Sequence, residues 1–318
     1  MFLPLERKRL MLYLGLAFGI AWAVALVIAL TGGLTNSPLL VPEFGITLAL
    51  VLLSLGYMWA PALAHLLTRV ITAEGWQGTG LRLGLRRGWR YYLAAWLVPA
   101  LMTLLGALVY FLVFPGQFST MQVDMLSAQG LSSPWLFVAG QVLLTVLFVP
   151  LVNGPFAFGE EFGWRGYMLP KLRPLGARRA MLASGAIWGV WHWPVILMGH
   201  NYGLSYPGAP WLGLLAMVWM TFVLGTFLNW LTLHSRSVWP ATIAHGAVNG
   251  IAGLPVLFLA QQPNMVIGPT LAGVLGSIGF AALALYLMLN PARLAPRHVE
   301  EIAPVPAQPA SPESFPQS

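Results

Sequence analysis

The sequence predicts an all-α membrane protein in which about eight helices cross the bilayer and both termini are cytoplasmic. Three observations lead to this prediction: the composition, the length of the apolar runs, and the placement of the basic residues. Of the 318 residues, 58% are hydrophobic and only 8% are charged, whereas a soluble domain carries about a quarter charged residues. Such a chain has too few charges to cover a water-facing surface, so we expect a polytopic membrane protein.

Windows of about 20 apolar residues, enough to cross a hydrocarbon core of about 30 Å, occur eight times. The fourth window contains Pro150 and Pro155, so we expect a kinked or broken helix there. Pro155 suits the first turn of a new helix, with Asn153 as a cap just before it. The predicted spans are 10–30, 46–68, 91–114, 135–158, 180–199, 211–233, 238–259 and 268–289.

The basic residues alternate strictly with these spans. All 16 Lys and Arg residues lie before the first span, after the last one, or in every second connection. The other four connections contain none: 31–45, 115–134, 200–210 and 260–267. By the positive-inside rule both termini are cytoplasmic. The basic excess therefore reflects topology and contact with anionic lipid headgroups, and it does not indicate nucleic-acid binding.

The two ends of the chain differ in character. The basic start is followed by an apolar run of about 21 residues without a small-residue cleavage site, which predicts an uncleaved first span. From residue 291 the sequence is polar and rich in Pro and Ala, so we expect 291–318 to be a disordered cytoplasmic tail. Residues 1–290 then form the eight-span domain. The chain contains no cysteine, which excludes disulfides, cysteine nucleophiles and cysteine metal sites.

A first polar cluster, Glu160, Glu161 and Arg165, follows the two prolines. Glu161 and Arg165 are four residues apart, the spacing of a favourable ion pair on a helix. Glu160 lies about 140° around the helix from Arg165 and lacks that partner. We therefore predict that Glu161 has an orienting role and that Glu160 faces inward with a functional role. The alternative is a solvated glutamate pair at the cytoplasmic end of a helix.

Two further clusters lie in predicted spans five and seven. Trp188 and His192 are four residues apart, as are His245 and Asn249. Taken singly, each pair could be ordinary interhelical polar packing, as could Asn229 in span six. Ionisable groups in apolar helices cost about 2.5–3.5 kcal/mol each, so together with Glu160 they predict one polar site inside the bundle. The predicted span boundaries place His192 further from the cytoplasmic side than Glu160 or His245. For the three residues to meet, the helix that carries Glu160 must tilt inward or span five must start later.

The three motifs, E-E-x-x-x-R, aromatic-x-x-x-H and H-x-x-x-N, occur in this order on successive helices. This pattern resembles the CPBP family, also called the Abi family, which comprises CAAX prenyl proteases and bacteriocin-processing intramembrane proteases. The family more often has Phe at the position of Trp188, and Gly166 fits its common R-G continuation. The motifs define a core at about 155–250.

The resemblance implies an intramembrane endopeptidase. Glu160 would take a proton from water, and the water would attack the scissile carbonyl. His245 and Asn249 would hold that water or stabilise the oxyanion, and His192 would complete the water site. Glu161, Arg165 and Trp188 would orient these groups. The sequence contains no HExxH zinc helix and no recognisable Ser-His-Asp arrangement.

A metal-dependent version of the site uses the same atoms. Glu160, His192 and His245 could bind Zn²⁺ and leave one position for water. Members of the family have been described both as glutamate-type and as metal-dependent proteases. We favour a site without a cofactor, because Asn249 is a poor zinc ligand but a good oxyanion donor.

The expected location is the plasma membrane of a bacterium, and the expected partners are the lipid bilayer and a membrane-associated peptide or protein substrate. Self-immunity against bacteriocins is a second biological setting. The alternative class is a non-proteolytic membrane protein, either a transporter or a scaffold for immunity, that uses the polar cluster for binding. The lack of an internal repeat argues mildly against transport.

Overall fold

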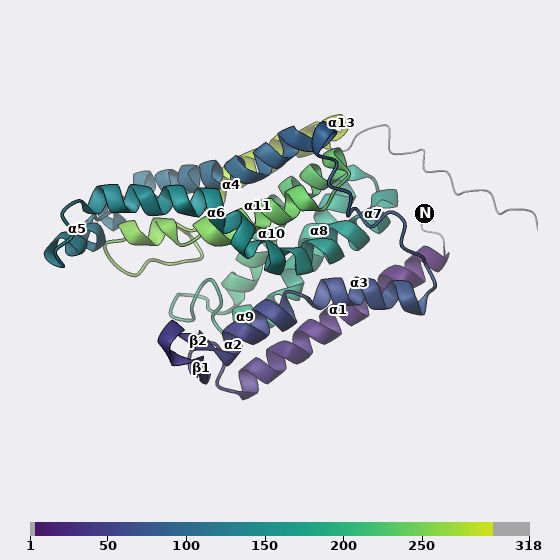
Figure 1. The fold of residues 1–318 in the computed structure, drawn as a ribbon, viewed down its shortest axis with the longest axis horizontal. Coiled ribbons are helices and arrows are strands. Elements are labelled where there is room, and N and C mark those ends of the chain that lie inside the picture. Colours follow the sequence, from purple (N-terminus) through teal and green to yellow (C-terminus); the bar gives the residue numbers. More distant parts are fainter. Residues whose placement is uncertain (1–3, 295–318) are drawn as a thin grey trace, which may run out of the picture.

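The computed structural model describes residues 4–294, and most of this part of the chain is helical (Figure 1). One small sheet occurs among the described residues, an antiparallel pair of β1 (Leu39–Val41) and β2 (Ile46–Thr47). The predicted fold class, an all-α membrane bundle, is therefore confirmed.

Eight helices of twelve or more residues build the bundle in the described part of the chain. Helix α10 packs against α8, α11 and α12, and α11 also packs against α6 and α4, so α10 and α11 occupy its centre. The eight are α1 (Pro4–Leu30), α3 (Ala60–Ile71), α4 (Leu85–Val113), α6 (Pro134–Gly163), α8 (Ala177–Trp191), α10 (Trp211–Ser235), α11 (Trp239–Ile251) and α12 (Ile278–Leu289).

Shorter helical segments connect these helices. The short α-helices are α2 (Leu48–Val51), α5 (Met121–Ala128), α7 (Leu169–Leu172), α9 (Trp193–Leu197) and α13 (Pro291–Leu294). The 3-10 helices are η1 (Pro42–Phe44), η3 (Pro115–Gln117), η5 (Arg173–Leu175) and η6 (Leu254–Phe258), and π-helical turns form η2 (Leu52–Tyr57) and η4 (Trp164–Met168).

Six helical segments of the described chain are long and apolar enough to cross a membrane. They match predicted spans one to four, six and seven: Pro4–Leu30, Leu48–Ile71, Gly88–Val113, Pro134–Leu175, Trp211–Ser235 and Trp239–Phe258. The chain is thus a multi-pass membrane protein, while the count of eight stays a prediction. The two remaining spans are interrupted, each for a local reason.

Predicted span five, 180–199, breaks at His192 into α8 and α9. Pro194 has no N–H and crowds the preceding turn, so it ends the helix there. In predicted span eight, 268–289, the first half is a series of turns rich in glycine, and a regular helix starts only at Ile278.

Of the two forms expected for span four, a kinked or a broken helix, the broken one is wrong. Helix α6 runs without interruption through Pro150 and Pro155, so Pro155 does not begin a helix. Asn153 is not a cap either, because it lies in the helix interior and its Nδ2 donates to the Val149 carbonyl at 3.5 Å. Proline at position 150 leaves the carbonyl of Val146 without its usual helical donor, and the indole N–H of Trp96 donates to it at 2.7 Å.

The predicted disordered tail begins with structure. Its first four residues form α13, in which Leu294 is fully buried. The remainder of that prediction, residues 295–318, lies outside the described residues.

The two ends of the bundle gather different segments of the chain. The start of α1 lies at the same end as α7 and α13, and α5 and the small sheet lie at the opposite end (Figure 1). Gln122 and Gln262, from two connections that lack basic residues, line one cavity at the α5 end.

Reporter fusions test this topology. A fusion at Gln122 or Gln262 is expected to be exposed outside the cell, and a fusion at Ala177 is expected to be cytoplasmic, because basic connections stay inside. Alkaline phosphatase and fluorescent-protein fusions measure the two sides. A cytoplasmic signal at Gln122 would disprove the eight-span arrangement.

Candidate active site

The predicted ion pair between Glu161 and Arg165 forms inside the protein. Arg165 Nη1 donates to Glu161 Oε1 at 2.8 Å, and both side chains are fully buried. The same oxygen accepts a second hydrogen bond from His245 Nδ1 at 2.8 Å. Arg165 Nε also donates to Asn229 Oδ1 on α10 at 3.1 Å. Glu161 therefore ties together α6, the η4 turn and α11, and α10 is joined through Arg165.

Glu160 occupies a different environment, although it is the next residue. Its Oε2 accepts a hydrogen bond from Trp188 Nε1 at 2.7 Å, and the residue is 2% exposed. No other hydrogen bond within the described residues reaches this carboxylate, so Oε1 is left without a protein donor. The two adjacent carboxylates thus have separate partners, as their angular separation on the helix predicts.

The interruption of span five places His192 at the end of α8. Its Nδ1 lies 2.8 Å from the carbonyl oxygen of Trp188, so we assign the proton to Nδ1 and a free lone pair to Nε2. The same break frees the carbonyl of Trp191. That oxygen accepts hydrogen bonds from Trp22 Nε1 at 3.1 Å and from the Tyr57 hydroxyl at 2.5 Å.

His245 is buried on α11, and its tautomer follows from its partner. Because Nδ1 faces the Glu161 carboxylate, Nδ1 carries a proton and Nε2 points elsewhere. Asn249, one turn further along α11, has an exposed side chain that makes no hydrogen bond with the described residues.

Trp188 is the common neighbour of the groups that the sequence predicted to converge. Its ring centroid lies 5.8 Å from that of His192 and 5.5 Å from that of His245, and its N–H holds Glu160. The structure thus brings Glu160, His192 and His245 around one indole ring. Asn249 lies beside this group without joining it.

The zinc interpretation can be compared with these contacts. The assigned tautomers of His192 and His245 each leave Nε2 with a lone pair, which suits a metal ligand. In the part of the chain that the structure describes, however, no three side chains of the metal-binding types are gathered closely enough to hold an ion. As arranged, Glu160, His192 and His245 therefore do not form a three-ligand zinc site.

Sequence reasoning missed three supporting residues. Asn229 was interpreted as interhelical packing, but it orients the guanidinium of Arg165. Trp22 on α1 and Tyr57 in η2 hold the end of α8 through the Trp191 carbonyl. Trp22 and Tyr57 lie more than 100 residues before that carbonyl, and no spacing rule connects segments so far apart.

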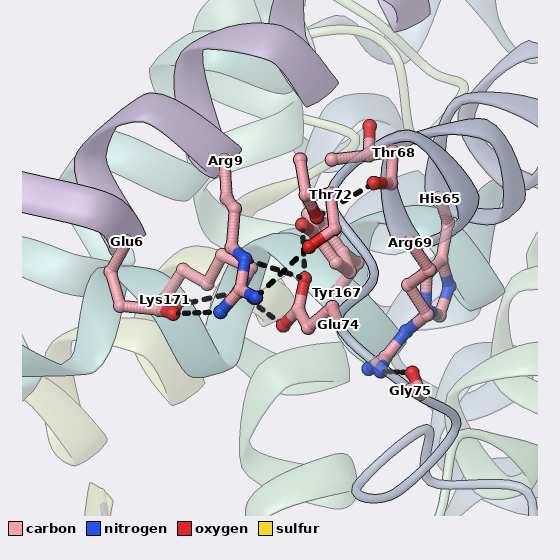
Figure 2. Close-up of polar contacts among 10 residues, drawn as sticks. All are labelled: Glu6, Arg9, His65, Thr68, Arg69, Thr72, Glu74, Gly75, Tyr167 and Lys171. Carbon is pink, nitrogen blue, oxygen red and sulfur yellow. Dashed lines mark hydrogen bonds and ion pairs between the residues drawn. The ribbon is translucent and has the colours of Figure 1, made fainter.

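A second polar cluster lies beside the site, where the start of α1, the end of α3 and α7 meet (Figure 2). Lys171 Nζ donates to Glu6 at 2.7 Å and to Glu74 at 2.6 Å, and Arg9 donates to Glu6 at 2.7 Å. The Tyr167 hydroxyl donates to Glu74 at 2.7 Å. Because Tyr167 belongs to the η4 turn, this cluster fixes the segment that directly follows Glu161.

His65 adds a second link to the same turn (Figure 2). Its Nδ1 lies 2.8 Å from the carbonyl oxygen of Phe162, and its Nε2 accepts from Arg69 Nε at 2.6 Å. The ring also packs on Phe162 and Tyr167, with centroids at 4.2 and 4.7 Å. Helix α3 therefore supports the end of α6 immediately after the two glutamates.

The pKa of Glu74 gives this cluster a testable pH dependence. Burial alone would raise the pKa of this carboxyl, but hydrogen bonds from Lys171 and Tyr167 and the Lys171 charge lower it by more, so the pKa lies below its ordinary value. A depressed carboxyl pKa stabilises the fold above the ordinary value, and this contribution is lost as the pH falls through the folded-state pKa.

We expect Glu74→Gln to lower the melting temperature at neutral pH and the difference from wild type to shrink as the pH falls below about 4.5. Thermal unfolding of detergent-purified protein across this pH range measures the effect. Glu43→Gln, at an exposed glutamate in η1, is the matched control and should leave the curve unchanged. A difference that stays constant at every pH would contradict the assigned role of the Glu74 charge.

Fold and contacts together define a class: a multi-pass helical membrane protein with a buried carboxylate and two histidines around one tryptophan. Comparison with known proteins relates part of this chain to a family of such membrane proteins. Residues 133–251 match the family described as "Type II CAAX prenyl endopeptidase Rce1-like". A CAAX prenyl protease 2 from Methanococcus maripaludis is 31% identical over 107 residues, which are 33% of this chain and 38% of that relative.

The resemblance predicted from the motifs is therefore confirmed, over the segment that contains α6, α8, α10 and α11. The chain matches less than two fifths of the length of this curated relative. Helices α1, α3 and α4 lie before the matched segment, so the contacts from Trp22, Tyr57 and His65 come from outside it.

Proposed function

We propose that this chain is an intramembrane endopeptidase of the CAAX-protease type, in which Glu160 activates a water molecule. The observation that carries the proposal is the state of the Glu160 carboxylate. It is buried among apolar helices, one oxygen is held by Trp188, and the other has no donor among the described residues. An acceptor oriented in this way suits a general base.

The proposed reaction follows from the available atoms. Glu160 Oε1 takes a proton from water while the water oxygen attacks the scissile carbonyl carbon. The second O–H of that water donates to the Nε2 lone pair of His245, and His192 completes the site around it. The Asn249 amide donates to the oxyanion that forms. Glu160 then returns the proton to the leaving nitrogen as the C–N bond breaks.

The other polar residues orient these groups. Glu161 holds His245 by its Nδ1 and keeps Nε2 as an acceptor. Arg165 balances the charge of Glu161, and Asn229 fixes Arg165 in turn. This division of labour gives the two adjacent glutamates different tasks, one chemical and one structural.

We propose a membrane-associated peptide or protein as the substrate and the plasma membrane of a bacterium as the location. The name of the archaeal relative makes a prenylated CAAX peptide the first substrate to assay. Detergent-purified wild-type protein, incubated with prenylated peptides and with a membrane-peptide library, is expected to cleave a subset of them. A transporter that uses the same cluster for binding would cleave none.

Chelation separates water activation from metal catalysis. Prolonged treatment with a strong chelator is expected to leave the activity of purified protein unchanged, and elemental analysis should find less than one zinc per chain. His192→Ala and His245→Ala should still lose activity, because the water is then misplaced. Stoichiometric zinc in active wild type, lost in both histidine variants, would instead support the metal-dependent mechanism.

A further inference from the structure

Trp188 makes more contacts with the polar site than any spacing argument assigns to it. Its indole Nε1 donates to Glu160 Oε2 at 2.7 Å, and its ring face lies 4.4 Å from the guanidinium carbon of Arg165. The ring also makes a T-shaped contact with the His245 ring, with centroids 5.5 Å apart. Its main-chain carbonyl accepts from His192 Nδ1.

We propose that the indole N–H of Trp188 is a positioning group for the reaction, which holds the Glu160 carboxylate so that Oε1 faces the water. This inference rests on the proposed function and adds to it a specific atom. An aromatic ring without a donor would fill the same space, so the proposal concerns the N–H rather than the ring.

The chemistry of indole favours this role. An indole nitrogen donates one hydrogen bond and accepts none, so it cannot compete with the carboxylate for the proton of the water. A carboxylate inside an apolar bundle has few alternative donors, and among the described residues Trp188 is the one that reaches it. A hydrogen bond to a charged acceptor is also stronger than one between neutral groups.

The surroundings of Trp188 make its own position rigid. The ring is 2% exposed and contacts both Arg165 and His245, each of which is held by Glu161. Gly225 on α10 lies against the same ring, where a side chain would come within 3.6 Å of it. A donor fixed on several sides restricts the rotation of its acceptor, which is how a supporting residue preorganises a catalytic group.

The test compares two replacements of Trp188. Trp188→Phe removes the N–H and part of the ring. Replacement by β-(3-benzothienyl)alanine, through an expanded genetic code, puts sulfur in place of the N–H and keeps the two-ring shape. Trp219→Phe is the matched control, since it removes an indole hydrogen bond to Ser277 outside the site, at 2.9 Å.

We expect both Trp188 replacements to lower kcat by about 10- to 100-fold, which is the range for loss of one hydrogen bond to a charged group. KM should change little in both. The benzothienyl protein should also keep the wild-type melting temperature, because its packing is preserved. Trp219→Phe should retain wild-type kcat.

Three outcomes would count against the proposal. Wild-type kcat in the benzothienyl protein, beside an inactive Glu160→Gln variant, would overturn the inference and leave the proposed function intact. A loss of kcat that only accompanies a lower melting temperature would assign Trp188 a packing role. Equal activity of wild type and Glu160→Gln would overturn the proposed function and this inference with it.

Discussion

Glu160→Gln is expected to reduce turnover by about 10²- to 10⁴-fold, which in a typical assay is background. The amide has nearly the same shape as the carboxylate, and its oxygen can still accept the hydrogen bond from Trp188. It cannot take a proton from water. The melting temperature should therefore stay close to that of wild type while peptide cleavage is lost.

The matched control for this variant is Glu43→Gln, which changes an exposed glutamate in η1. It makes the same chemical change and should leave cleavage unaffected. Full activity of Glu160→Gln would show that another group activates the nucleophile. Loss of activity together with a large loss of stability would assign Glu160 a structural role.

Glu161→Gln is expected to destabilise the protein strongly, whereas Glu160→Gln is expected to leave the melting temperature nearly unchanged. Both Arg165 Nη1 and His245 Nδ1 donate to Glu161 Oε1 at 2.8 Å, and the Arg165 side chain has no solvent exposure. Removing the negative charge leaves a buried guanidinium without compensation, which typically costs about 3–5 kcal/mol. Thermal unfolding in detergent measures this loss.

A double variant distinguishes a lost charge pair from general damage. Combining Glu161→Gln with Arg165→Met removes both charges, so part of the stability lost in Glu161→Gln should return. If Glu161→Gln proves stable but inactive, the roles assigned to the two glutamates are reversed. If the second substitution adds its full cost to the first, Glu161 and Arg165 do not act as a pair.

The sequence predicts the membrane bundle well because composition and span length reflect the solvent, which acts on every residue. The sequence does not predict whether a given proline interrupts its helix. Pro150 and Pro155 were expected to kink or break a helix. The break does not occur, since α6 continues through both and Trp96 satisfies the carbonyl of Val146. Pro194, in contrast, ends α8 and produces the break beside His192.

Helical periodicity was similarly effective for local pairs. The four-residue spacing of Glu161 and Arg165 predicted their ion pair, and the offset of Glu160 predicted its separate environment. Spacing carries no information about which helices become neighbours. The bond from His245 to Glu161, which are 84 positions apart in the sequence, and the bond from Trp188 to Glu160 depend on tertiary packing.

The central claim, that Glu160 activates the water that cleaves a peptide bond, is tested most directly by isotope incorporation. Wild-type protein in liposomes is given a cleavable peptide in ¹⁸O-labelled water, beside Glu160→Gln at equal folded concentration. Mass spectrometry follows the rate at which product with one ¹⁸O in its new carboxyl group appears. The proposed mechanism predicts labelled product from wild type and almost none from Glu160→Gln, whereas equal rates of labelling from the two proteins would contradict it.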